Sequence, residues 1–301
     1  MRALFQDIPI NIYVQKTQEF NTFLSYMSQM NLNLDTNGFR SIANSFDLFF
    51  IDIWGVIHNG ISIFEDSINV LDELDKLNKE YVLLTNAPRP NDTVKNFLIK
   101  MGLEKIKSEK VYTSGEAALE NLSLKWKDKK FFHIGPPRDF DLFKLFEKNK
   151  VNNISDAEFL LCTGLFEKYE EELDYYKSLL KNITAIKMIC TNPDLVVDRG
   201  EVREYCAGSV AKIFEELGGF VDYFGKPYPL VYNQSININN KKILCIGDNL
   251  NTDIRGANMQ NFNSLLILNG IHKKELINSN INNLMKKYNV KIDYTQTVLK
   301  W

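Results

Sequence analysis

The chain has 301 residues, of which 45% are hydrophobic and 25% are charged, and its formal net charge at pH 7 is -2. These values are typical of a globular protein with one large domain or two smaller ones, and they indicate no basic surface for nucleic acid. Nucleic acid is therefore not an expected partner. A membrane is not expected either, because no apolar run is long enough to span a bilayer. The four cysteines form no C-x-x-C pair, which favours a reducing, cytoplasmic location.

The predicted elements begin with helix and continue as an alternation of strands and helices. Residues 1–45 are expected to be mainly helical, over residues 17–30 and then 37–44. Short runs rich in Val, Ile, Leu and Phe follow, and their apolar character on both faces predicts a parallel sheet covered by helices. These strands are predicted at residues 48–53, 81–85, 110–113, 243–246 and 264–268. With the amphipathic helix expected at residues 67–78, the succession predicts an α/β fold with a doubly wound parallel sheet.

The middle third of the chain carries its own supply of strands and helices. They are predicted at residues 130–134, 159–162, 167–180, 185–190 and 210–217. We therefore expect an inserted α/β domain at residues 118–221, between two parts of a core at residues 46–117 and 222–301. Residues 1–45 are then a helical N-terminal extension of that core.

Polar residues follow two of the predicted core strands at their carboxyl ends. Asp52 ends the first strand and is followed by Trp54 and Gly55, and Thr85-Asn86 ends the second. Ligands of open α/β sheets bind at this edge, where a carboxylate, a hydroxyl and an amide could meet a polar substrate. Taken singly, each of these residues is also an ordinary one with which to leave a strand.

Two further motifs lie in the last third of the chain. Gly225-Lys226-Pro227 places a lysine between residues that restrict the backbone, and its ammonium could neutralise phosphate charge, although a solvated loop lysine is commoner. Asp248 and Asp253 share one loop directly after a predicted buried strand, and two carboxylates so placed suit a hard cation such as Mg²⁺. Helix capping accounts for one of these acidic residues but not for both.

In their order along the chain these motifs resemble the four motifs of the haloacid dehalogenase-like superfamily. The motif residues are Asp52, Thr85-Asn86, Lys226, Asp248 and Asp253. The insertion before the lysine motif resembles the class IIA cap. The motif sequences, and Thr191-Asn-Pro-Asp194 in the insertion, are similar to those of nucleotide, nitrophenyl-phosphate and phosphoglycolate phosphatases. The likeness covers residues 46–301 and leaves the N-terminal segment unexplained.

The resemblance implies a Mg²⁺-dependent phosphatase with a small phosphorylated substrate. Asp52 would be the nucleophile that forms an aspartyl-phosphate, and Thr85, Asn86 and Lys226 would bind the phosphoryl oxygens. The metal ligands would be Asp52, Asp248, Asp253 and the backbone carbonyl of Trp54. Such a site disperses the negative charge that develops during phosphoryl transfer. The resemblance leaves a homodimer open as the assembly.

The sequence departs from the family pattern at position 54. In the common Asp-x-Asp motif the second Asp protonates the leaving group, whereas Asp52-Ile53-Trp54 offers an indole, which cannot. Acid–base catalysis typically contributes about 10²–10⁴-fold, so we expect a slow enzyme, or one for aryl or acyl phosphates, whose leaving groups need little protonation. His58 is the nearest alternative proton donor, although a polar turn position is its commoner role.

Other interpretations of the same motifs remain open. The site could bind phosphorylated ligands without turning them over, as a regulatory module, and the fold also hosts dehalogenases. A dehalogenase needs no metal, so Asp248 and Asp253, which suit a metal ion, argue against that activity. Four polar residues of the insertion could reach the non-phosphate part of a substrate, although surface placement is commoner for any one of them. They are Asn192, Asp194, Arg199 and Arg203.

Overall fold

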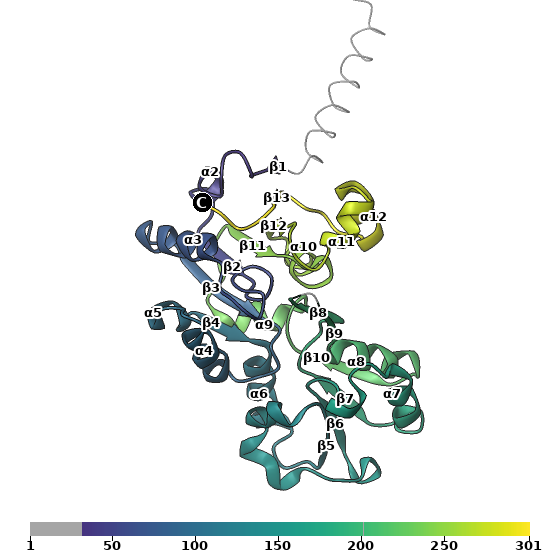
Figure 1. The fold of residues 1–301 in the computed structure, drawn as a ribbon. Coiled ribbons are helices and arrows are strands. Elements are labelled where there is room, and N and C mark those ends of the chain that lie inside the picture. Colours follow the sequence, from purple (N-terminus) through teal and green to yellow (C-terminus); the bar gives the residue numbers. More distant parts are fainter. Residues whose placement is uncertain (1–31, 201) are drawn as a thin grey trace, which may run out of the picture.

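A seven-stranded sheet, the core sheet, dominates the structure, a computed structural model that describes residues 32–200 and 202–301 (Figure 1). Its order is β1-β13-β12-β11-β2-β3-β4, and every neighbouring pair is parallel. The strands are β1 Leu32–Asn33, β2 Leu48–Ile51, β3 Glu80–Thr85, β4 Val111–Thr113, β11 Ile243–Gly247, β12 Asn263–Ile267 and β13 Tyr294–Gln296. The predicted α/β class with a doubly wound parallel sheet is confirmed.

Both faces of the core sheet are covered. Alternate side chains of β2 show this, because Phe49 and Ile51 belong to one hydrophobic cluster whereas Leu48 and Phe50 belong to another. Burial on both faces explains why the core strands are apolar throughout and do not alternate with polar residues. The helices of this part are α2 Arg40–Ala43, α3 Glu65–Lys76, α4 Asn91–Lys100, α5 Lys105–Ser108, α6 Ser114–Lys125, α9 Pro229–Ser235, the π-helical turn η5 Leu250–Ile254, α10 Arg255–Met259, α11 Lys273–Asn278 and α12 Ile281–Tyr288.

A second parallel sheet, ordered β10-β7-β6-β5, forms the centre of what we call the cap region, residues 131–223. Its strands are β5 Phe131–Ile134, β6 Phe159–Cys162, β7 Lys187–Cys190 and β10 Phe220–Tyr223, and its helices are α7 Leu173–Leu180 and α8 Ala207–Glu216. Short 3₁₀ turns complete it at η1 Pro137–Leu142, η2 Lys144–Asn149, η3 Ile154–Asp156 and η4 Glu167–Tyr169. Phe131 and Phe159 share one hydrophobic cluster with Phe50, so the two sheets are joined by continuous apolar packing.

A two-stranded antiparallel hairpin of the cap region, β8 Val196–Arg199 with β9 Val202–Tyr205, lies between the core sheet and the sheet β10-β7-β6-β5 (Figure 1). Neither strand is predicted from the sequence. Their residues are half-buried or exposed and include four charged side chains, so the apolar runs that indicate the other strands are missing here. This hairpin is the element that brings residues of the cap region to the edge of the core sheet.

Several predicted boundaries differ from those in the structure. The predicted helix over residues 37–44 shortens to α2, the edge strand β1 precedes it, and residues 17–30 lie outside the described residues. The helix predicted at residues 167–180 divides into η4 and α7 around three adjacent glutamates, whose charges are favourable before a helix N-terminus. The predicted domain limits at 117/118 and 221/222 fall inside α6 and β10, and the division into core and inserted domain stays a prediction.

Across the described residues, each helix is too short or too polar to cross a lipid bilayer.

Candidate active site

The carboxyl ends of β2 and β11 lie side by side, where the strand order changes direction. Asp52 follows β2, Asp248 follows β11, and Thr85 ends β3 on the other side of β2. Parallel strands point their carboxyl ends to the same edge of a sheet, which is why residues so far apart in the sequence meet here. The topology thus gathers the predicted motif residues at one place.

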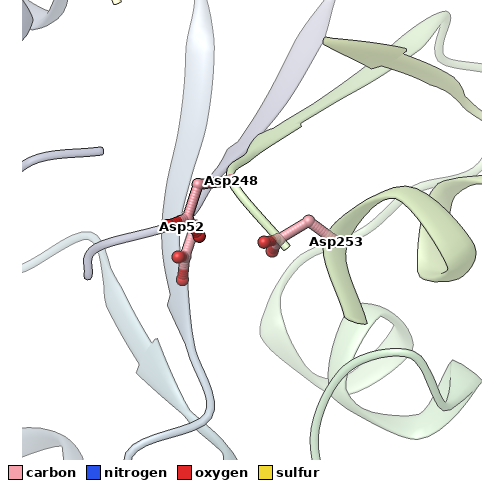
Figure 2. Close-up of side chains that lie close together, drawn as sticks. All are labelled: Asp52, Asp248 and Asp253. Carbon is pink, nitrogen blue, oxygen red and sulfur yellow. The ribbon is translucent and has the colours of Figure 1, made fainter. Parts of the chain in front are cut away.

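Asp52, Asp248 and Asp253 form a cluster of buried carboxylates (Figure 2). One oxygen atom of each lies within 4.8 Å of the others. The Nζ atom of Lys226 donates to Asp52 Oδ1 at 2.5 Å and to Asp253 Oδ1 at 2.6 Å. When all four groups are ionised, three negative charges face one positive charge, and a divalent cation with oxygen ligands would neutralise the remaining two. The donor set therefore fits Mg²⁺.

The pKa values of this cluster show how strongly its charges interact. Burial raises the pKa of Asp52 well above its usual value, the nearby charge of Asp253 raises it further, and Lys226 opposes both. Burial also raises the pKa of Asp248 to about 7, again with a contribution from Asp253. Burial alone would lower the pKa of Lys226, but Asp253 and Asp52 keep it above its ordinary value. The lysine is therefore a permanent cation at this site.

Backbone groups hold two of the carboxylates in place. The N–H of Ile271 donates to Asp248 Oδ2 at 2.8 Å, and the N–H of Asn249 donates to Asp253 Oδ2 at 3.1 Å. Gly55 has a φ of +84°, and a Cβ atom there would lie 2.2 Å from Asp248 Oδ2. Only glycine fits that position, so the loop after β2 can approach the cluster closely.

Asn86 lines the cavity, and its side-chain amide positions the lysine. Its Oδ1 accepts the backbone N–H of Lys226 at 2.7 Å, and its Nδ2 donates to the carbonyl of Lys226 at 3.0 Å and to Asp194 Oδ1 at 3.3 Å. The sequence predicts a phosphate contact for Asn86, which stays a prediction; in the structure its side-chain amide is hydrogen-bonded to protein atoms. Its effect on a phosphate would then be through Lys226.

A cavity of about 960 Å³ lies beside the carboxylate cluster, between the core sheet and the cap region. Thr85 and Trp54 line it from the core. Thr85 Oγ1 accepts the N–H of Ala87 at 3.2 Å, which leaves the hydroxyl hydrogen available to a ligand. A cavity of this size would enclose a small phosphorylated molecule.

The cap region contributes more of this cavity than the sequence indicates. Asn192, Asp194, Arg199 and Arg203 all line it, although surface placement is the commoner outcome for such residues. Asp194 lies beside Asn86, and burial raises the pKa of its carboxyl to about 6. In the sequence, the motif Thr191-Asn-Pro-Asp194 is the feature that indicates this residue.

His58 is buried against the wall of the same cavity. Its Nδ1 accepts the N–H of Gly60 at 2.8 Å, and its ring packs edge-on against Trp54 and Phe97. Burial lowers the pKa of His58 to about 4, and the charge of Arg199 contributes in the same direction. A neutral imidazole at pH 7 donates a proton poorly, which weighs against the proton-donor role predicted for His58.

This low pKa predicts a pH-dependent stability. Between pH 6.5 and about pH 4 the unfolded chain protonates His58 and the folded chain does not, so the free energy of unfolding should fall as the pH falls. His58 contributes at most about 3 kcal/mol to this loss. Urea denaturation at pH 4.5 and pH 7.5 should show a smaller difference for His58→Gln than for the wild type. Equal differences would mean that His58 titrates normally in the folded protein.

Two family models match the chain at the segments that contain these residues. The model described as haloacid dehalogenase-like hydrolase matches residues 49–147, which include Asp52 and Thr85. A HAD-hydrolase-like model matches residues 223–289, which include Lys226, Asp248 and Asp253. The haloacid dehalogenase-like family is thus recognised in two separate segments of the chain.

Comparisons with individual proteins over most of the chain agree with the family models. It is 22% identical over 235 residues to the 5'-nucleotidase YutF of Bacillus subtilis, which covers 75% of this chain and 89% of that protein. It is 22% identical over 295 residues to phosphoglycolate phosphatase 2 of Arabidopsis thaliana, covering 88% and 95%. A haloacid dehalogenase-like hydrolase from Brucella suis superposes with a TM-score of 0.72 at 28% identity, covering 78% of this chain and 90% of the other. By its motifs, its fold and its relatives, this chain belongs to the haloacid dehalogenase-like hydrolases.

Proposed function

We propose that this protein is a Mg²⁺-dependent phosphohydrolase that acts on a small phosphorylated molecule through nucleophilic attack by Asp52. The observation that carries the proposal is the buried Asp52 carboxylate, which is held by Lys226 beside two further carboxylates and is followed in the chain by Ile53 and Trp54, which line a cavity. The enzymes to which the chain is similar include a 5'-nucleotidase and a phosphoglycolate phosphatase. Both names describe the removal of a phosphate group.

In the proposed reaction an oxygen of Asp52 forms a bond to phosphorus while the bond from phosphorus to the leaving oxygen breaks. Lys226 neutralises the phosphoryl oxygens, and the Thr85 hydroxyl donates to one of them. Mg²⁺, held by the three aspartates, would supply further charge neutralisation so that an anionic carboxylate can approach an anionic phosphate. Water then cleaves the aspartyl-phosphate, which releases phosphate and restores Asp52.

The residue at position 54 limits the kind of substrate. Trp54 cannot protonate a leaving group, and His58 is neutral at pH 7. An aryl or acyl phosphate leaves as a weakly basic anion and needs little protonation, so it suits this site better than an alkyl phosphate. Without any turnover, the same residues would form a Mg²⁺-dependent binding site for phosphorylated molecules.

One pair of measurements separates these two functions. Mg²⁺ at about 100 times its dissociation constant should stabilise the folded protein by about 2.7 kcal/mol, seen as a higher unfolding temperature that EDTA reverses. With Mg²⁺ present, the protein should release phosphate from 4-nitrophenyl phosphate and from acetyl phosphate. Stabilisation without release would indicate a binding module, and an unchanged unfolding temperature would contradict the metal site. Asp248→Asn should lose the Mg²⁺ effect, because it removes a ligand from the cluster.

A further inference from the structure

The indole of Trp54 contacts the hairpin β8–β9. Its Nε1 donates to the backbone carbonyl of Asp198 at 2.7 Å, and the guanidinium of Arg199 lies 5.1 Å from the centroid of its ring. On another side the ring packs so closely on Gly60 that a Cβ atom there would lie 2.7 Å from it. The side chain is thus fixed between the loop after β2 and a strand of the cap region.

A second contact ties the same hairpin to the other loop of the cluster. Arg203 of β9 donates through Nη2 to the carbonyl of Ile271 at 2.9 Å, and the N–H of Ile271 donates to Asp248. The guanidinium of Arg203 is oriented by two hydrogen bonds to the carboxylate of Asp198, at 2.7 Å and 2.9 Å. The hairpin therefore rests on both core loops that hold the buried carboxylates.

The position of the hairpin determines the shape of the cavity. Arg199, Arg203 and Tyr205 of the hairpin line it, together with Trp54 from the core. A substrate whose phosphoryl group lies at the carboxylate cluster would extend its remaining atoms into this space. Those atoms would meet the hairpin, whereas the phosphoryl group would not.

We propose that Trp54 is a positioning residue that fastens the hairpin β8–β9 across the mouth of the site, in place of the acid–base group that position 54 carries in the family pattern. The side chain of an ionised aspartate there could not do this, because it has no N–H to donate and, like the carbonyl of Asp198, can only accept hydrogen bonds. The fastening itself is independent of catalysis. Its consequence for substrate selection, namely that the hairpin contacts the leaving group, rests on the proposed function.

Amide hydrogen exchange tests the fastening without any substrate. Trp54→Phe keeps an aromatic ring but removes the indole N–H, so the strands β8 and β9 should exchange about 3- to 10-fold faster, as expected for the loss of one hydrogen bond. Trp126→Phe is the matched control, because Trp126 packs against Phe159 away from the hairpin, and it should leave this exchange unchanged. Unchanged exchange in Trp54→Phe would overturn the proposal.

A second variant tests whether the faster exchange in Trp54→Phe is local to the hairpin or reflects a general loss of packing. Arg203→Gln shortens the side chain that reaches Ile271 and leaves Trp54 in place. It should also speed exchange in β8 and β9, whereas the strands of the core sheet keep their protection. Faster exchange throughout the protein in both variants would mean that they only destabilise the fold, and would contradict a local fastening.

Steady-state kinetics test the consequence for the substrate. In Trp54→Phe the KM for 4-nitrophenyl phosphate should rise about 3- to 10-fold, while the KM for acetyl phosphate, whose leaving group is too small to reach the hairpin, rises less than about twofold. Equal rises for both substrates would refute the role in selection. If the wild type releases no phosphate from either, the proposed function fails, and hydrogen exchange still decides whether Trp54 fastens the hairpin.

Discussion

Replacing Asp52 with Asn should abolish Mg²⁺-dependent phosphate release, with kcat reduced by at least about 10³-fold. An amide has almost the shape of the carboxylate, but it is not a nucleophile and carries no charge for the metal. The fold should tolerate the change, because burial and Asp253 already disfavour the ionised form of Asp52. We therefore expect an unfolding temperature, measured without Mg²⁺, that is equal to or above that of the wild type.

Lost activity together with retained stability would show that Asp52 takes part in the reaction and not in the stability of the fold. Asp75→Asn is a suitable control, because Asp75 pairs with Lys110 at 2.8 Å on the outside of the core and lines a surface recess away from the site. It should keep wild-type kcat and KM. An Asp52→Asn variant with more than about a tenth of wild-type activity would show that another group attacks the phosphorus.

Replacing Lys226 with Met should have the largest effect on stability. The ammonium is the partner of two buried carboxylates, and its removal leaves them without a cation. Breaking a buried ion pair on one side typically costs about 3–5 kcal/mol, because the remaining charge stays desolvated. Urea denaturation in EDTA should show a loss of this size, and phosphate release should fall at least about 10²-fold.

Lys107 provides a matched comparison elsewhere in the core. It is also buried and also binds two carboxylates, those of Asp72 at 2.8 Å and Glu104 at 2.7 Å. Their side chains are 42% and 65% exposed, so water can solvate them when the lysine is lost. Lys107→Met should therefore cost clearly less stability than Lys226→Met and leave kcat unchanged. Equal losses of stability would mean that the carboxylate cluster is better solvated than its burial indicates.

The class of the fold and the residues of the cluster are predictable from the sequence for a physical reason. A strand buried on both faces must be apolar along its whole length, so β2, β3 and β11 are visible as short apolar runs. Polar residues directly after such runs lie at the edge of a parallel sheet, which identifies Asp52, Thr85 and Asp248 as neighbours. The marginal strands β1 and β13 give no such signal, because they are only two and three residues long.

The tertiary structure decides the roles that depend on partners far away in the sequence. Nothing in the local sequence of Asn86 indicates that it binds the backbone of Lys226, and the burial that makes His58 neutral comes from separate segments. The strands of the hairpin β8–β9 mix valines with charged residues and are only half-buried or exposed, so they leave no periodic apolar pattern. Trp54 has one property that the sequence determines and another that only the tertiary structure decides. The sequence by itself determines that position 54 lacks an acid, because an indole cannot donate a proton to a leaving group. Only the folded chain places Asp198 at hydrogen-bond distance from that indole, because a contact across 144 residues depends on how the chain packs.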